Sequence, residues 1–115
     1  MGALEKACAQ AAEGGKIVVA DFCTGWCAPQ TLWEDPEVLS WLQERAVFVA
    51  IDAEKEAAAA ERFRVMSYPT ILLLRPDGSE FDRLVGFRSP KEFLADASAA
   101  LEGKDTLARA KEALG

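Results

Sequence analysis

Cys27 is the residue of this chain that is best placed for chemistry. It lies in the stretch FCTGWCAPQTLW, residues 22–33, after a strand-like run and before a helix-like one. A thiolate at a helix start meets unpaired backbone N–H groups and the positive end of the helix dipole, which lower its pKa and make it nucleophilic. The adjacent Trp26 and the nearby Pro29 favour this interpretation over an inert core cysteine. We therefore predict that Cys27 is the most reactive thiol.

Two other residues decide what that thiol could do. A dithiol redox motif would have its second cysteine three residues after Cys27, where this chain has Gln30. An amide can donate a hydrogen bond toward the sulfur, but it cannot attack a mixed disulfide. Cys23 could replace the missing thiol as the resolving residue of a Cys-x3-Cys pair, provided that the two Cα atoms lie within about 7 Å. The alternative is that Cys23 is a small buried residue, as we also expect for Cys8.

Asp21 is a carboxylate within the apolar run KIVVADF, residues 16–22. An unpaired buried carboxylate is costly and tends to have a raised pKa, so its presence requires a reason. It either acts on the cysteine site or is a strand-end residue with a local hydrogen-bond partner. The chain has no histidine, which excludes Ser–His and Cys–His nucleophile pairs and histidine metal sites. We predict no metal site.

Composition limits the partners further. The formal net charge is −6, and the acidic residues are spread along the 115 residues. Nucleic acids and anionic membrane surfaces attract concentrated basic charge, so neither is expected as a partner. The apolar runs are too short to cross a bilayer. We see no export signal, which makes the cytoplasm the default compartment, although a mature domain cut from an exported precursor would look the same.

The elements that must position these residues alternate between strand and helix. Asp35 and Pro36 predict a capped second segment within a kinked or two-part helix. Asp77 and Gly78 predict a hairpin turn, and Ser89 to Glu92 a helix start that ends at Gly103. We expect Trp33, Trp41 and Phe48 in the core. The expected helices cover residues 3–13, 28–43, 53–65, 89–103 and 104–115, and the expected strands cover 16–22, 46–51, 70–74 and 81–87.

This pattern predicts an α/β fold in one domain, residues 1–115. Its core covers about residues 16–101, and residues 104–115 form a helical tail. A strand, a helix and a strand in this order imply a parallel crossover, whereas the hairpin adds an antiparallel strand. The result is a central mixed four-stranded sheet with helices on both faces.

The combination of VVADFCTGWCAP, VAIDAE and SYPTILLLRPDGSEFDRLVGF resembles the thioredoxin superfamily. The likeness is greatest to the thioredoxin-like domains of thiol:disulfide interchange proteins. The resemblance implies that Cys27 is the attacking cysteine and that Asp21 relays protons beneath it. It also implies that Pro69 follows a cis bond and packs against the sulfur, and that Trp26, Tyr68 and Pro69 bind the substrate. Gln30 departs from the family pattern.

Three functions remain open at this point. The first is thiol–disulfide exchange by the single nucleophile Cys27, isomerase-like or glutathione-dependent, on cysteine-containing proteins or peptides. The second is a non-enzymatic module that binds peptides or proteins through the groove at Tyr68 and Pro69. The third is a glutathione-assisted iron–sulfur carrier, which the absence of a glycine-rich motif after Cys27 disfavours. No resident cofactor is expected, with glutathione as a co-substrate at most.

Overall fold

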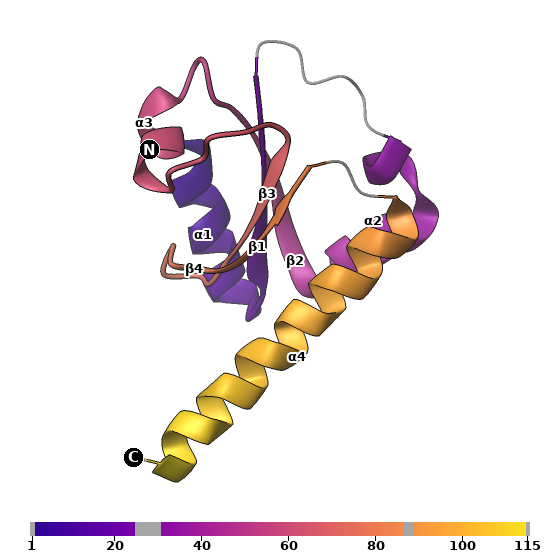
Figure 1. Cartoon of the computed structure of the whole chain (residues 1–115), viewed down its shortest axis with the longest axis vertical. Helices are drawn as coiled ribbons and strands as arrows, with labels where there is room; N and C mark the ends of the chain where they lie inside the picture. Colours follow the sequence, from indigo (N-terminus) through magenta and orange to yellow (C-terminus); the bar gives the residue numbers. More distant parts are fainter. Residues whose placement is uncertain (1, 25–30, 87–88, 115) are drawn as a thin grey trace.

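A mixed four-stranded sheet forms the centre of the computed structural model (Figure 1), which describes residues 2–24, 31–86 and 89–114, without the side chains of residues 31 and 103–114. The strands lie in the order β2-β1-β3-β4. They are β1 (Ile17–Cys23), β2 (Ala46–Asp52), β3 (Thr70–Leu74) and β4 (Glu80–Val85). The helices are α1 (Ala3–Gly14), α2 (Pro36–Arg45), α3 (Ala57–Arg62) and α4 (Pro90–Leu114), with a 3₁₀ helix η1 (Thr31–Glu34).

β1 is a central strand, and all seven of its residues are buried. It pairs in parallel with β2, from Ile17 opposite Ala46 onward, and antiparallel with β3. β3 in turn pairs antiparallel with β4. The continuous apolar run of β1 is what a strand covered on both faces requires. The predicted mixed four-stranded α/β fold is confirmed.

Helices cover both faces of the sheet, as predicted. In Figure 1, α1 and α3 lie on one side of the strands, and α2 and α4 lie on the other. Side chains alternate along a strand, so β1 contributes Val18, Ala20 and Phe22 to the core beneath α1 and α3. Ile17 and Val19 enter the second core, beneath α2 and α4.

Local side-chain chemistry sets the start of α2. The Asp35 carboxylate accepts hydrogen bonds from the N–H groups of Glu37 and Val38, and Pro36 occupies the first helical position. Proline costs nothing there because its missing N–H would have no partner inside the helix. The predicted two-part helix is therefore correct for residues 31–45, as η1 followed by α2.

The hairpin between β3 and β4 also forms where the sequence predicts it. The Asp77 carboxylate accepts hydrogen bonds from the N–H and hydroxyl of Ser79. Gly78 has φ of 90°, a value that glycine adopts without steric cost. The Gly78 N–H donates to the carbonyl of Arg75 and closes the turn.

Two predictions about burial were wrong. Phe48 was expected in the core, but β2 is an edge strand and Phe48 is 38% exposed. Cys8 of α1 was expected to be a small buried residue. The buried positions of α1 are Leu4, Ala7 and Ala11, which are three and four residues apart and so lie on one face of the helix, and Cys8 is only half-buried.

Two helix boundaries also differ from the prediction. The helix expected over residues 53–65 is shorter, because the Asp52 carboxylate and carbonyl accept the N–H groups of residues 54–56 in a turn. Arg64, with φ of 53°, ends the segment after α3. The last helix was expected to end at Gly103, but α4 continues to Leu114. The Ala-rich sequence that follows Gly103 favours helix strongly enough to offset one glycine, which costs about 1 kcal/mol.

Candidate functional site

The carboxyl end of β1 brings two of the predicted site residues onto one face of the sheet. Asp21 and Cys23 alternate with Phe22 and so lie on the face of Ile17 and Val19. Two residues along a strand correspond to about 7 Å between Cα atoms. Both side chains are buried, Asp21 at 3% and Cys23 at 5% exposure. A carboxyl group and a sulfur thus share a buried environment at the strand end.

Asp21 has one hydrogen-bond partner among the described residues. Its Oδ2 accepts from Nε1 of Trp33 at 3.0 Å, and its buried Oδ1 has no partner there. Burial disfavours the charged form and raises the pKa of Asp21 to about 6, although the hydrogen bond from Trp33 acts in the opposite direction. A carboxyl group with this pKa exchanges protons readily near neutral pH.

Trp33 is the site residue that the sequence interpretation missed. It was expected to be only a core residue, but it comes from η1 and orients the carboxyl group of Asp21. Its ring lies 4.6 Å from the ring of Phe48 and 5.4 Å from that of Phe93, between centroids. A partly buried tryptophan N–H commonly finds an acceptor, and a buried aspartate twelve residues earlier was the available signal.

The segment before β3 lies beside the end of β1. Thr70 pairs with Phe22, so Pro69 comes next to the strand end that carries Cys23. The Tyr68–Pro69 peptide bond is cis. The Thr70 hydroxyl donates to the carbonyl of Ser67 at 2.6 Å, and the N–H of Gly86 donates to the carbonyl of Pro69 at 2.9 Å. These bonds fix the segment, and Tyr68 remains 38% exposed next to it.

Three predicted site residues, Trp26, Cys27 and Gln30, lie outside the described residues. Their roles stay predictions, as does the packing of Pro69 against Cys27. Of the other two cysteines, Cys8 is a free thiol that contacts the core on the face of the sheet opposite Asp21. Burial is the main cause that raises its pKa. Cys8 therefore lacks the features of a reactive thiol.

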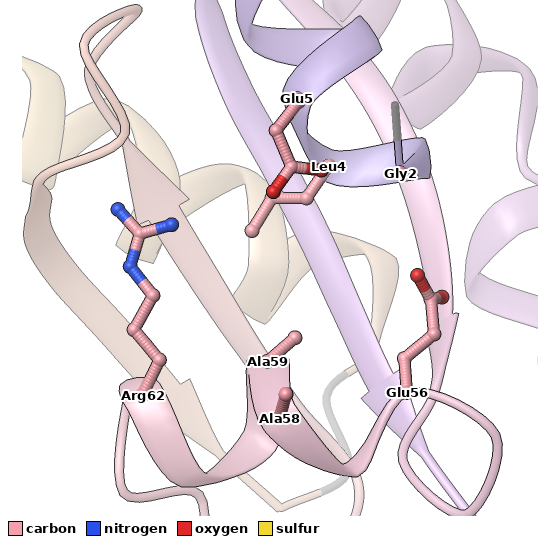
Figure 2. A pocket seen from close by; sticks show the side chains of 7 residues that line it. All are labelled: Gly2, Leu4, Glu5, Glu56, Ala58, Ala59 and Arg62. Carbon is pink, nitrogen blue, oxygen red and sulfur yellow. The ribbon is translucent and has the colours of Figure 1, made fainter.

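A cavity of about 310 Å³ lies apart from this site, between the start of α1 and α3. Figure 2 shows Leu4 and Glu5 on one side of it, and Glu56 and Arg62 on the other. Leu4 belongs to the core beneath α1 and α3, so the cavity is on the opposite face of the sheet from Asp21. The lining residues that the structure describes include two carboxylates and one guanidinium and no thiol.

A shallower hollow of about 270 Å³ lies on the same face as Asp21. It is apolar and is lined by Trp33, Phe48, Leu39 and Leu42, among others. Leu39 and Phe48 are exposed, so the outer side of Trp33 is reached from solvent while its N–H faces Asp21.

Within the described ranges, no group of three or more cysteine or acidic side chains is arranged to hold a metal ion. The same part of the chain has no helix with the length and apolar character needed to cross a membrane.

Comparison with known proteins places this arrangement in a family. A family model described as a thioredoxin-like domain matches residues 4–100. The chain belongs to the thioredoxin-like family. It is 34% identical over 90 residues to the thioredoxin of Bacillus subtilis, which covers 76% of this chain and 83% of that protein. The solution structure of a thioredoxin from Thermus thermophilus superposes with a TM-score of 0.72 at 29% identity, covering 84% of this chain and 82% of that one.

A thioredoxin H-type protein of Oryza sativa subsp. indica is also similar, with 35% identity over 81 residues. The match covers 69% of this chain but only 65% of the rice protein, so the chain spans less than two thirds of that relative's length. Thioredoxin-like proteins form a family of thiol–disulfide oxidoreductases. The resemblance recognised from the sequence is therefore confirmed at the level of the family.

Proposed function

We propose that this protein catalyses thiol–disulfide exchange on protein or peptide disulfides, with Cys27 as its attacking thiol. Because Gln30 occupies the position of the family's resolving cysteine, the protein works in an isomerase-like or glutathione-dependent manner rather than as an autonomous Cys-x-x-Cys reductase. The observation that carries the proposal is Asp21, a buried carboxyl group at the end of β1 with one oxygen unpartnered among the described residues. Such a group is costly to keep in a core and suits a proton-exchanging site.

The chemistry begins with the Cys27 thiolate. It attacks one sulfur of a substrate disulfide, forms a mixed disulfide and displaces the other substrate sulfur as a thiolate, which takes up a proton. In the isomerase-like route, the displaced substrate thiol later attacks the mixed disulfide and leaves Cys27 reduced. In the glutathione-dependent route, the glutathione thiolate attacks instead and carries the substrate sulfur away as a glutathione mixed disulfide. Each route conserves electrons and needs no further oxidant.

Tyr68 and Pro69 are the proposed substrate-binding residues, together with Trp26. Pro69 is buried beside the end of β1 and Tyr68 is partly exposed, so an extended peptide could lie against this segment and reach the cysteine site. Met66, two residues earlier, is 90% exposed and offers further apolar contact. This surface supports a substrate with apolar residues next to its disulfide.

A protein in which Cys27 is the only thiol tests the proposal directly. In the Cys8→Ser/Cys23→Ser variant, the thiolate absorbance should titrate with a pKa below the ordinary value of about 8.5. Oxidised glutathione should then add one glutathionyl group to Cys27, and reduced glutathione should remove it. The matched control carries Cys23→Ser and Cys27→Ser, so that Cys8 is its only thiol. It should form no adduct. A pKa at or above the ordinary value, with no adduct, would contradict the proposal.

The competing function is a binding module that uses the surface at Tyr68 and Pro69 without any cysteine chemistry. The exposure of Tyr68 and Met66 is the observation that favours it. In that case Cys27→Ser should bind extended peptides as well as the natural protein does. Under the exchange function, the same variant should lose covalent trapping of a peptide disulfide completely.

A further inference from the structure

β1 carries a second thiol on the same face as the unpartnered oxygen of Asp21. We propose that Cys23 is the internal resolving thiol of this protein and that Asp21 is its proton acceptor. This inference rests on the proposed function and concerns only its release step, where it gives the Cys27 mixed disulfide an intramolecular exit in place of the direct glutathione route. The resolving residue would then lie four residues before Cys27, whereas in the family pattern it lies three residues after it, where this chain has Gln30.

The first support is the state of the three cysteines. Cys23 takes part in a disulfide bond, whereas Cys8 is free. The chain has one further cysteine, so we infer that Cys27 is the partner of Cys23. In the reduced protein the Cys23 thiol has an acceptor close by, because its Sγ lies 3.5 Å from the carbonyl oxygen of Ile51.

The second support is independent of the cysteines. The Asp21 side chain is 97% removed from solvent, and its Oδ1 has no hydrogen-bond partner within the described residues. Oδ2 is held by the N–H of Trp33, so the carboxyl group has a fixed orientation and one oxygen available for a proton. Cys23 is the residue two positions further on the same strand face, about 7 Å away at Cα. Asp21 and Cys23 thus share one buried strand face, and the proposal requires proton transfer between them directly or through one water molecule.

The proposed step balances as follows. Asp21 Oδ1 accepts the proton of the Cys23 thiol, and the Cys23 thiolate attacks the Cys27 sulfur of the mixed disulfide. A Cys23–Cys27 disulfide forms, and the substrate leaves as a thiolate that takes a proton from Asp21 or from water. The substrate is thereby reduced and the protein oxidised by two electrons. Two molecules of a small thiol such as glutathione then reduce the internal disulfide and become one disulfide themselves.

Oxidised glutathione is the probe for this step. Trypsin cuts after Lys16 and Arg45, so Cys23 and Cys27 fall in one peptide, residues 17–45, and Cys8 in another. The full-length natural protein and its Cys8→Ser control should yield peptide 17–45 two hydrogens lighter than its reduced form and free of glutathione. Cys23→Ser and Cys23→Ala should instead retain one glutathionyl group on Cys27.

Asp21→Asn removes the proposed base and leaves the Cys23 thiol in place. The internal disulfide should still form in this variant, but glutathione release from Cys27 should slow by at least about tenfold at pH 7. The pH dependence is the readout that a purely structural role would not change. Release in the natural protein should rise as Asp21 ionises, near pH 6, and this rise should be absent in the variant.

The outcomes distinguish the two proposals. If natural protein and Cys23→Ser retain the glutathionyl group on Cys27 equally, Cys23 does not resolve and only this inference fails. If Cys27 forms no adduct even in Cys23→Ser and Cys23→Ala, the proposed function fails and this inference with it. If both Cys23 variants misfold, the natural protein decides alone, since a glutathionyl group retained on its peptide 17–45 would overturn the inference.

Discussion

The carboxyl group of Asp21 is held in a state that opposes stability. Burial disfavours its ionised form more than the single hydrogen bond from Trp33 favours it, and its pKa is therefore raised to about 6. The folded protein thus binds a proton more tightly than the unfolded chain does, in which an aspartate has a pKa near 3.8. Burial of Asp21 lowers the stability of the folded protein at every pH at which the group is ionised. Only the ionised group can accept a proton from a thiol.

Asp21→Asn should therefore stabilise the protein in a pH-dependent manner. The favourable contribution of a raised pKa is complete below the unfolded value and is lost as pH rises through about 6. At pH 8 the free energy of unfolding of the variant should exceed that of the natural protein by up to about 3 kcal/mol, since each pKa unit corresponds to about 1.4 kcal/mol. Near pH 3 the difference should almost vanish. Urea unfolding at both pH values measures it, and an equal difference at both would contradict the assignment.

Trp33→Phe tests the hydrogen bond that holds this carboxyl group. The substitution keeps an aromatic ring beside Phe48 and Phe93 but removes the N–H donor that lowers the pKa of Asp21. The pKa of Asp21, followed by NMR of its carboxyl carbon, should rise further above 6. Trp41→Phe is the matched control, because Trp41 also packs on Phe93 but has no contact with Asp21. The prediction is wrong if both variants shift this pKa equally.

At the scale of elements, the sequence predicted features that depend on neighbouring residues, such as helix caps. It did not predict where an element lies in the sheet. Asp35 and Pro36 gave the start of α2 correctly, because a cap depends on residues within one turn. The start of α3 was missed, since it depends on a turn at Asp52 that competes with the helix. Phe48 was expected in the core because the apolar sequence of β2 does not reveal that this strand lies at an edge of the sheet.

The cap of α2 should have a measurable energetic contribution. Asp35→Ala removes the acceptor of two backbone N–H groups at the start of a helix that directly follows η1. The free energy of unfolding should fall by about 1 kcal/mol. Glu34→Ala, at an exposed position one residue earlier, should change it by less than about 0.5 kcal/mol. Equal losses in the two variants would show that Asp35 does not act as a cap.

At the scale of the whole molecule, the sheet order decides which chemical groups meet. Placing β1 between β2 and β3 brings the segment around Pro69 next to the strand end that carries Asp21 and Cys23. η1 and α2 cover the same face, so Trp33 reaches Asp21 from a different part of the chain. The pattern of the sequence was sufficient to predict the mixed sheet and the buried position of Asp21. It could not predict the partner of Asp21, because that contact depends on how η1 packs against the sheet.

The position of the resolving thiol determines how fast the mixed disulfide on Cys27 is released. An intramolecular thiol has a high effective concentration, whereas glutathione must collide with the mixed disulfide from solution. Cys23→Ser should therefore be a poor reductase of a protein disulfide whose rate rises in proportion to added glutathione. Adding Gln30→Cys to this variant restores a thiol at the family's usual position, and it should raise the glutathione-independent rate at least about tenfold.

Insulin reduction followed by turbidity measures these rates, with each variant reduced beforehand, freed of small thiols and supplied in stoichiometric amount as the source of electrons. Gln30→Ser in the Cys23→Ser background is the matched control. That control alters the same residue but supplies no thiol, so its rate should stay with that of Cys23→Ser alone. If Gln30→Cys also leaves the rate unchanged, position 30 does not reach the Cys27 sulfur in this protein. The family's usual geometry would then not apply to residue 30, and the chain would have to depend on Cys23 or on an outside thiol for every release.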